Sequence, residues 1–218
     1  GEKYLDECIK SVLDQTYKNW EIIFWDNQSK DNSKKICLSF NDKRIKYFYA
    51  EFHTNLYEAR NLAIDKTNGE LIAFLDTDDL WYKEKLSIQV PLFSNNKIGL
   101  VCSNFIFLNE MNKKRKLWHN KKNKSGYVLD NLLKEYFIGL PTVIIRKKAL
   151  NNLSYVFNSK YNIIGDFDLF VRISQEWQIK YIDEPLALYR WHGKNIAFNE
   201  TDREIEELQN WLENIKTE

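Results

Sequence analysis

The stretch Leu71-Ile72-Ala73-Phe74-Leu75-Asp76-Thr77-Asp78-Asp79-Leu80-Trp81 joins an apolar run to three acidic residues within four positions. The apolar run follows the turn-forming pair Asn68-Gly69, and such a run after a turn is typical of a strand buried on both faces of a sheet. The acidic residues come just after the carboxyl end of this strand, where open α/β sheets place their ligand crevices. The stretch therefore predicts a buried strand with a binding site at its end.

Two interpretations of the acidic residues remain open from the stretch alone. Carboxylates packed this closely repel one another, and a shared cation removes the repulsion. A hard divalent cation such as Mg²⁺ or Mn²⁺, bound through oxygen atoms and bridging to a phosphate, fits that need. In the alternative, Asp78 or Asp79 caps a helix that begins near Tyr82, because acidic residues are favoured at helix N-termini.

Length and composition indicate one packed domain. A chain of 218 residues with 44% hydrophobic and 15% aromatic residues is long enough for a single α/β domain with a substantial core. The 32 basic and 31 acidic residues leave a net charge of +1, so overall charge gives no reason to expect a nucleic acid partner.

Cysteine usage and hydropathy indicate the compartment. Cys8, Cys37 and Cys102 lie far apart in apolar periodic segments, which predicts buried thiols rather than disulfides or a metal site. No apolar run approaches the roughly 20 residues of a membrane span, and the N-terminus does not resemble a signal peptide. We therefore expect a cytoplasmic protein, at most peripheral at the inner face of the membrane.

Helical and strand patterns alternate along the chain. The helical ranges are 4–15, 31–40, 56–66, 83–93, 128–137, 166–177 and 201–215, and the strand ranges are 20–25, 44–50, 71–75, 98–108, 142–146, 179–182 and 186–189. This alternation predicts right-handed βαβ units and a Rossmann-like, mostly parallel sheet flanked by helices. An α/β domain does not usually begin with an amphipathic helix, so we expect a first strand before Gly1 that this sequence lacks.

One basic stretch interrupts the alternation. Seven basic residues between positions 113 and 124 surround Trp118 and His119. Charge runs of this kind are usually solvated, mobile loops. The functional alternative is a surface for anionic groups on an acceptor or a membrane. Nucleic acid binding is the least favoured alternative, because the loop lacks regularly spaced stacking aromatics.

Acidic residues fall at three comparable places, namely Asp26 after one strand, the Asp76 to Asp79 cluster after another, and Asp166 at the start of a helix. With these residues the sequence resembles the family 2 glycosyltransferases of the GT-A fold over nearly its whole length. The segments that carry the resemblance follow the family's order, and they are Tyr4-Leu5 with residues 11–17, then 25–33, 59–63, 74–81, 165–169 and 189–192. The implied fold is that of a GT-A type nucleotide-diphospho-sugar transferase.

The resemblance implies that a nucleotide-sugar, most often a UDP-sugar, lies across the carboxyl edge of the sheet. Asp26 would accept a hydrogen bond from the base, and Arg60 would lie near the base or the diphosphate. Asp76 and Asp78 would form the Asp-x-Asp motif, with Asp78 the direct ligand of Mn²⁺ or Mg²⁺ and Asp76 closer to the ribose or the metal. The cation would offset the charge that grows on the leaving diphosphate. Asp79 would support the motif or cap a helix.

The resemblance also assigns the base. Asp166 would take the proton from an acceptor hydroxyl during a single displacement with inversion. Gly165 departs from the family, since many relatives carry an acidic residue there. Asp168 is a competing carboxylate that a helix N-terminus also explains. His192 stands where related enzymes often place a histidine near the metal or diphosphate, although a lone histidine is often structural.

We therefore expect a single GT-A catalytic domain over residues 1–198 and a C-terminal amphipathic helix over residues 199–218. The expected activity is that of an inverting, metal-dependent hexosyltransferase. It would move a sugar from a nucleotide-sugar donor to a hydroxyl of a glycan or lipid-linked acceptor in cell-surface polysaccharide synthesis. One alternative is a nucleotide-sugar or glycan-binding module of the same fold without turnover. The other is a haloacid-dehalogenase-type phosphatase, which would require a threonine where Leu80 stands.

Overall fold

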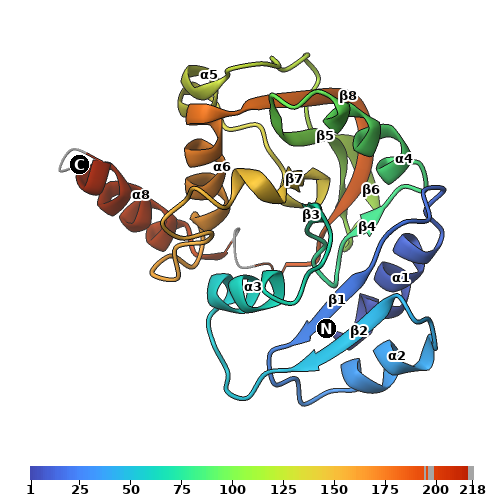
Figure 1. Ribbon diagram of the computed structural model, residues 1–218. Coiled ribbons are helices and arrows are strands. Elements are labelled where there is room, and N and C mark those ends of the chain that lie inside the picture. Colours follow the sequence, from blue (N-terminus) through green and yellow to red (C-terminus); the bar gives the residue numbers. More distant parts are fainter. Residues whose placement is uncertain (194, 196–198, 216–218) are drawn as a thin grey trace.

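The computed structural model describes residues 1–193, 195 and 199–215, and it confirms the α/β class (Figure 1). The helices are α1 (Glu2–Leu13), α2 (Ser33–Ser39), α3 (Leu56–Ile64), α4 (Lys85–Gln89), α5 (Leu129–Lys134), α6 (Gly165–Glu176) and α8 (Thr201–Ile215). The strands are β1 (Ile22–Asp26), β2 (Ile45–Tyr49), β3 (Leu71–Ala73), β4 (Leu80–Trp81), β5 (Ile98–Asn109), β6 (Lys114–Leu117), β7 (Ile144–Arg146) and β8 (Gln178–Trp191).

The strands form two sheets. β1 and β2 pair in parallel, and the larger sheet has the order β3-β7-β5-β8-β4, with β6 paired to β5. β3, β5 and β8 run in one direction, whereas β7, β4 and β6 run in the other. The larger sheet is thus more mixed than simple alternation suggests. A short loop joins β5 to β6, and such a loop makes an antiparallel hairpin rather than a crossover.

The prediction of two short strands on either side of Pro185 is wrong. Residues 178–191 form the single strand β8, which pairs with β5 along its length. Proline lacks the backbone N–H that a central strand needs. The register of β5 against β8 shifts on both sides of Asn104, which is the partner of Pro185. The bulge accommodates Pro185, which has no N–H to donate, so the strand continues.

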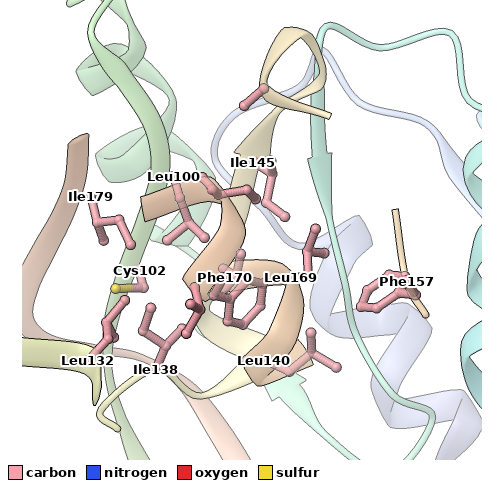
Figure 2. Packing of buried hydrophobic residues seen from close by; sticks show 14 of the residues in the cluster. Leu100, Cys102, Leu132, Ile138, Leu140, Ile145, Phe157, Leu169, Phe170 and Ile179 are labelled. Carbon is pink, nitrogen blue, oxygen red and sulfur yellow. The ribbon is translucent and has the colours of Figure 1, made fainter. Parts of the chain in front are cut away.

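Two apolar clusters cover the two faces of the larger sheet. On one face Leu100, Cys102 and Ile145 pack against Leu169 and Phe170 of α6 (Figure 2). This packing fixes α6, and with it the residues at the N-terminus of that helix.

On the other face of the sheet, Val101 and Ala187 pack against Leu86 of α4 and Val12 of α1. The three cysteines are buried free thiols, as predicted. No helix of the described ranges has the length and apolar character that crossing a bilayer requires.

A large cavity lies between the two sheets. Within the described residues β1 pairs only with β2, and β3 pairs only with β7. The cavity has a volume of 2030 Å³, is lined by Phe24 of β1 and Ile72 of β3 among others, and extends to Asp76 and Asp78. Gly1 lies beside the end of β3, since a Cβ atom on Gly1 would be 3.4 Å from the Thr77 hydroxyl. The strand expected before Gly1 stays a prediction.

Candidate active site

The acidic residues after β3 point to different partners. Arg60 Nη2 on α3 donates to both carboxylate oxygens of Asp76, at 2.7 and 3.0 Å. Asp78 Oδ2 lies 2.9 Å from His192 Nε2. Asp79 Oδ1 accepts from the backbone N–H of Arg190 at 2.9 Å. The three carboxylates of this stretch therefore contact three different partners, which are Arg60 of α3, the His192 ring and the backbone of Arg190 in β8.

The helix-capping interpretation of this stretch is wrong. Leu80 and Trp81 form strand β4, and α4 begins only at Lys85, with Glu84 at its N-cap and no side-chain cap. Asp79 is instead buried, with 1% of its surface exposed. Burial, together with the negative charges of Asp76 and Asp78, raises the pKa of Asp79, while the Arg190 N–H opposes this shift.

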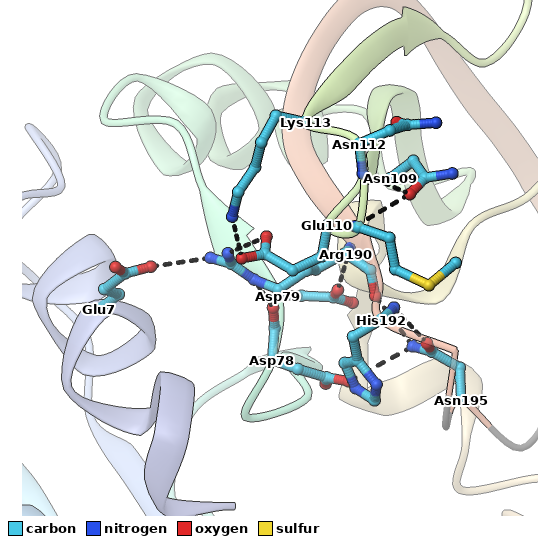
Figure 3. Close-up of polar contacts among 11 residues, drawn as sticks. Glu7, Asp78, Asp79, Asn109, Glu110, Asn112, Lys113, Arg190, His192 and Asn195 are labelled. Carbon is cyan, nitrogen blue, oxygen red and sulfur yellow. Dashed lines mark hydrogen bonds and ion pairs between the residues drawn. The ribbon is translucent and has the colours of Figure 1, made fainter.

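Arg190 connects the acidic stretch to α1 and β5 (Figure 3). Its Nε donates to the Asp78 carbonyl oxygen at 2.8 Å, Nη1 lies 2.9 Å from Glu110, and Nη2 lies 2.8 Å from Glu7. The guanidinium also lies 4.3 Å from the ring centroid of Tyr4. Sequence reasoning identified Arg190 only as a neighbour of His192, because Glu7 lies 183 positions away and no local pattern reports such a contact.

Replacing Arg190 by glutamine is expected to lower the free energy of unfolding by about 2–4 kcal/mol. Arg190 is 6% exposed, and its loss leaves the partly buried Glu110 and the Asp78 carbonyl without this donor. Lys10→Gln is the matched control, since it removes one positive charge from an exposed pair with Asp6 and should cost less than about 1 kcal/mol. Urea unfolding measures both, and equal effects of the two substitutions would contradict the prediction.

His192 is held in place on several sides. Its ring stacks on Tyr4 at 5.8 Å between centroids with an interplanar angle of 16°. Its backbone N–H donates to Asn195 Oδ1 at 2.9 Å, and Asn195 Nδ2 lies 3.4 Å from Asp78 Oδ2. These contacts orient the imidazole toward Asp78.

Asp78 and His192 fit a divalent cation that is completed by a substrate. Among the described residues, no three His, Cys, Asp or Glu side chains are grouped to hold a metal by themselves. Mg²⁺ in particular is usually held by one or two carboxylates together with substrate phosphates and water. A carboxylate and an imidazole that converge on one cavity fit such a site. Asp76 pairs with Arg60, and its expected contribution to the metal site stays a prediction.

Asp166 lies in the first turn of α6 and lines the same cavity as Asp76 and Asp78. Its carboxylate accepts from the Phe167 N–H at 2.9 Å and from the Tyr136 hydroxyl at 3.4 Å, and the Tyr57 hydroxyl oxygen lies 3.3 Å from it. Burial by the surrounding protein raises the pKa of Asp166, and the nearby Arg60 guanidinium opposes the shift without cancelling it. The two tyrosines were missed from the sequence.

Gly165 has a steric explanation. A Cβ atom at this position would lie 2.7 Å from atoms of the Tyr57 ring, which is too close for any side chain. Tyr57 in turn donates to the Ile163 carbonyl at 2.7 Å and contacts Asp166. The absence of an acidic residue before Asp166 therefore follows from the position of Tyr57.

Asp168 is fully engaged in the fold. Its Oδ2 accepts from Arg172 Nη2 at 2.6 Å, and its Oδ1 accepts from Trp211 Nε1 of α8 at 3.0 Å. Asp168 is 3% exposed and is not among the residues that line the cavity. These contacts agree with a structural role for this carboxylate.

The helix α8 also contacts the backbone just before α6. Glu207 accepts from the N–H groups of Asn162, Ile163 and Ile164 at 2.8, 2.9 and 3.2 Å. Ile164 is the N-cap of α6, and Asn162 and Ile163 precede it, so these N–H groups have no partner within the helix and the carboxylate satisfies them. The loop that leads to Asp166 is therefore held by the C-terminal helix.

Asp26 lies behind the cavity wall. Its carboxylate accepts from the Ser29 N–H at 2.7 Å and from the Tyr47 hydroxyl at 2.6 Å, and 2% of the residue is exposed. The neighbours Trp25 and Asn27 line the cavity, whereas Asp26 does not. The structure thus brings Arg60, Asp76, Asp78, Asp166 and His192 to one cavity but leaves Asp26 at its margin.

The basic stretch is only partly a loop. Residues 114–117 form β6, which pairs with β5 and has four exposed residues. His119, just beyond it, places Nε2 3.0 Å from the Phe137 carbonyl oxygen, and burial lowers the pKa of this imidazole. Sequence reasoning missed this strand because its charges masked the alternation.

The fold is of the GT-A type, and two comparisons with solved structures show the same fold. The crystal structure of TarS from S. aureus matches with a TM-score of 0.73 and 18% identity, over 87% of this chain and 35% of that chain. The crystal structure of TarS 1–349 in complex with UDP matches with a TM-score of 0.72 and 19% identity, over 87% of this chain and 57% of that chain. This chain therefore spans about a third to about three fifths of the TarS chains.

The chain belongs to glycosyl transferase family 2, whose family model matches residues 1–154. It is 32% identical to the UDP-Glc:alpha-D-GlcNAc-diphosphoundecaprenol beta-1,3-glucosyltransferase WfgD of Escherichia coli, over 98% of this chain and 83% of that protein. It is 29% identical to the putative teichuronic acid biosynthesis glycosyltransferase TuaG of Bacillus subtilis, over 90% of this chain and 77% of that protein.

Proposed function

We propose that this protein is an inverting, metal-dependent glycosyltransferase that moves a hexosyl group from a UDP-sugar to a hydroxyl of a lipid-linked sugar diphosphate. The observation that carries the proposal is the meeting of three groups in one cavity: the Asp78 and His192 pair, the Arg60 and Asp76 pair, and Asp166. The names of WfgD and TuaG, together with TarS complexes with UDP and with UDP-GlcNAc, support this donor class and a role in cell-surface polysaccharide synthesis.

The donor end of the reaction is assigned to the residues after β3. Asp78 and His192 would hold a Mn²⁺ or Mg²⁺ ion, which when bound offsets the charge that develops on the diphosphate. Arg60, held by Asp76 and 12% exposed, presents a fixed positive charge to the same group. Asp26 would accept a hydrogen bond from the base after a small rearrangement of its contact with Tyr47.

The acceptor end is assigned to Asp166. The acceptor oxygen forms a bond to the anomeric carbon as the bond from that carbon to the diphosphate oxygen breaks, and UDP leaves. The proton of the acceptor hydroxyl passes to the Asp166 carboxylate. The raised pKa of Asp166 makes this carboxylate a stronger base than an exposed aspartate. Tyr57 and Tyr136 keep it oriented.

The sequence left two alternatives to this function, a phosphatase and a binding module without turnover. The phosphatase alternative is not supported, because the chain belongs to glycosyl transferase family 2. A binding module without turnover would keep the cavity and lose transfer. A lipid-linked acceptor would bring the protein to the membrane surface, which is the basis for proposing a peripheral location.

A panel of UDP-, GDP- and dTDP-sugars tests the proposal. We expect a UDP-sugar to bind in the presence of Mn²⁺ and to bind much more weakly in EDTA, because the diphosphate would lack the cation. Calorimetry measures binding, and released UDP measures turnover. A protein that binds no donor with or without metal contradicts the proposal, and binding without turnover on any acceptor favours the binding module.

A further inference from the structure

The hairpin formed by β5 and β6 has a strongly basic outer edge. Among the described residues β6 pairs with β5 alone, so its other edge is open, and all four of its residues are exposed. From position 111 to position 124 the chain has seven basic residues and no acidic one. We name the three cations of β6 the basic edge, and they are Lys114, Arg115 and Lys116.

The basic residues of this segment differ in whether a carboxylate neutralises them. In the loop after β6, Lys121 Nζ lies 2.7 Å from Glu135, and Lys122 Nζ lies 3.8 Å from Asp183. Within the part of the chain that the structure describes, the three cations of the basic edge form no ion pair. The positive charge without a carboxylate partner is therefore densest on β6.

Exposed apolar side chains flank the basic edge at both ends. Met111 at the tip of the hairpin is 67% exposed, and Leu117 and Trp118 at the other end are each 38% exposed. Lys116 Nζ lies 5.2 Å from the Trp118 ring centroid. Cations mixed with exposed apolar and aromatic groups suit the interface of an anionic bilayer, because lipid phosphates attract the cations and the acyl boundary takes up the apolar groups.

The tip of the hairpin is held in place before it meets any partner. Asn109 Oδ1 accepts from the N–H groups of Met111 and Asn112 at 3.0 and 3.3 Å. Glu110 Oε2 accepts from Arg190 Nη1 at 2.9 Å, which attaches the turn to β8 (Figure 3). The exposed Met111 side chain therefore projects from a turn of defined conformation.

The same tip lies beside the candidate metal site. Arg190, to which the turn is bonded, also donates through Nε to the Asp78 carbonyl oxygen at 2.8 Å. Met111 Sδ would lie 3.9 Å from a Cβ atom placed on Gly193, the residue after His192. A bilayer in contact with Met111 would thus lie next to the residues assigned to the metal.

We propose that the basic edge, together with Met111, is a docking surface for a bilayer that contains anionic phospholipids. The cations of β6 contact lipid phosphates, and the exposed apolar groups at both ends of the strand enter the interfacial region. Long Lys and Arg side chains reach this plane from either face of the strand, since their flexible stems extend past the backbone. The docking does not depend on sugar transfer. Its consequence, that a lipid-linked acceptor meets the cavity at this surface, rests on the proposed function.

Sedimentation with vesicles tests where the surface lies. Two variants each lose three exposed positive charges: Lys114→Gln with Arg115→Gln and Lys116→Gln, the β6 variant, and Lys121→Gln with Lys122→Gln and Lys124→Gln, the matched control. On vesicles of equal parts phosphatidylcholine and phosphatidylglycerol, the β6 variant should bind about tenfold or more weakly than the wild type. The control should bind nearly as the wild type does.

Three further results bear on the same experiment. Wild-type binding should weaken in added salt and should be much weaker on vesicles of phosphatidylcholine alone. Both variants should unfold in urea at nearly the wild-type midpoint, because every substituted residue is exposed. Equal loss of vesicle binding in the two variants, or none in the β6 variant, would overturn the docking surface.

A label at position 111 tests the contact without changing the basic edge. The three native cysteines are buried, so the thiol of Met111→Cys can be labelled selectively with an environment-sensitive fluorophore. Its emission should shift to shorter wavelength on anionic vesicles, and the same label at Lys35→Cys, exposed on α2, should not respond. An unshifted label at position 111 on protein that sediments with the vesicles would contradict the proposed surface.

Two acceptors separate the docking surface from the proposed function. The β6 variant should keep the wild-type KM for a water-soluble N-acetylglucosaminyl diphosphate on a short alkyl chain. Its KM for a long-chain form embedded in anionic vesicles should rise about tenfold or more. Equal rises for both acceptors would assign the cations to the acceptor phosphates and overturn the docking surface. If no UDP-sugar binds, the proposed function fails, while sedimentation and emission still decide the docking surface.

Discussion

Asp166→Asn is expected to abolish sugar transfer while leaving UDP-sugar binding nearly unchanged. An amide of almost the same shape keeps the contacts with Tyr57 and Tyr136 but cannot take a proton from the acceptor. Loss of a general base costs about 10²- to 10⁴-fold in rate. Single-turnover assays with saturating donor measure the rate, and calorimetry measures donor affinity.

Asp168→Asn is the matched control for this prediction. Asp168 is a buried neighbour on the same helix that bonds Arg172 and Trp211, so its substitution should lower stability and leave the rate of transfer by the folded protein largely intact. If Asp168→Asn abolishes transfer in folded protein and Asp166→Asn does not, the base has been assigned to the wrong carboxylate.

The pKa of Asp166 also gives the expected pH dependence. The base must be ionised, so the rate should fall as the pH falls through the raised pKa of Asp166. The sign for stability is the opposite. Because the folded-state pKa is raised, this group's contribution to stability is fully present below its unfolded pKa and is lost as the pH rises through the folded value. Asp166→Asn should therefore increase the free energy of unfolding near neutral pH relative to the wild type, measured by urea unfolding.

Asp78→Ala is expected to remove metal-dependent binding of the donor, with a loss of affinity of about 100-fold or more in Mn²⁺. The substitution removes the carboxylate that faces His192, but the Asp78 carbonyl still accepts from Arg190, so the stretch should keep its conformation. Calorimetric titration of the UDP-sugar in Mn²⁺ and in EDTA measures the effect.

Asp76→Asn separates this role from a general effect of charge. That substitution weakens the pairing with Arg60 and should reduce donor affinity by a similar factor in Mn²⁺ and in EDTA. An Asp78→Ala protein whose donor binding still depends on Mn²⁺ as in the wild type would show that Asp78 is not the metal ligand.

The spacing of apolar residues along the sequence predicted the helices that bury one face. In α1, Leu5, Ile9 and Val12 recur at helical spacing and are buried as expected. The bounds of α8 agree with the sequence prediction, and β5 differs by one residue. The sequence predicts two strands in place of β8 because a proline normally ends a strand. The unpaired residues of the bulge, Asp183, Glu184 and Leu186, lie in β8 itself, and only the pairing with β5 on both sides of them shows that the strand continues.

In the candidate site, too, the sequence indicated residues that stand in local motifs but not the distant residues that contact them. Asp78, Asp166 and His192 stand in motifs whose order along the chain indicated them, and the structure brings them to one cavity. The sequence did not indicate the residues that hold these side chains in place. Arg190 depends on a glutamate of α1, and the hydroxyls around Asp166 come from segments that only tertiary packing brings together. The bonding of Asp26 to Tyr47 depends in the same way on strand pairing.

The contacts of α8 bear on how small a working enzyme can be. Glu207 and Trp211 supply hydrogen bonds to the backbone and to the side chain on either side of Asp166. A shortened chain that ended at residue 198 would lose both and would expose three N–H groups beside the proposed base. We therefore expect the minimal functional unit to include the C-terminal helix, although that helix contributes no residue to the cavity.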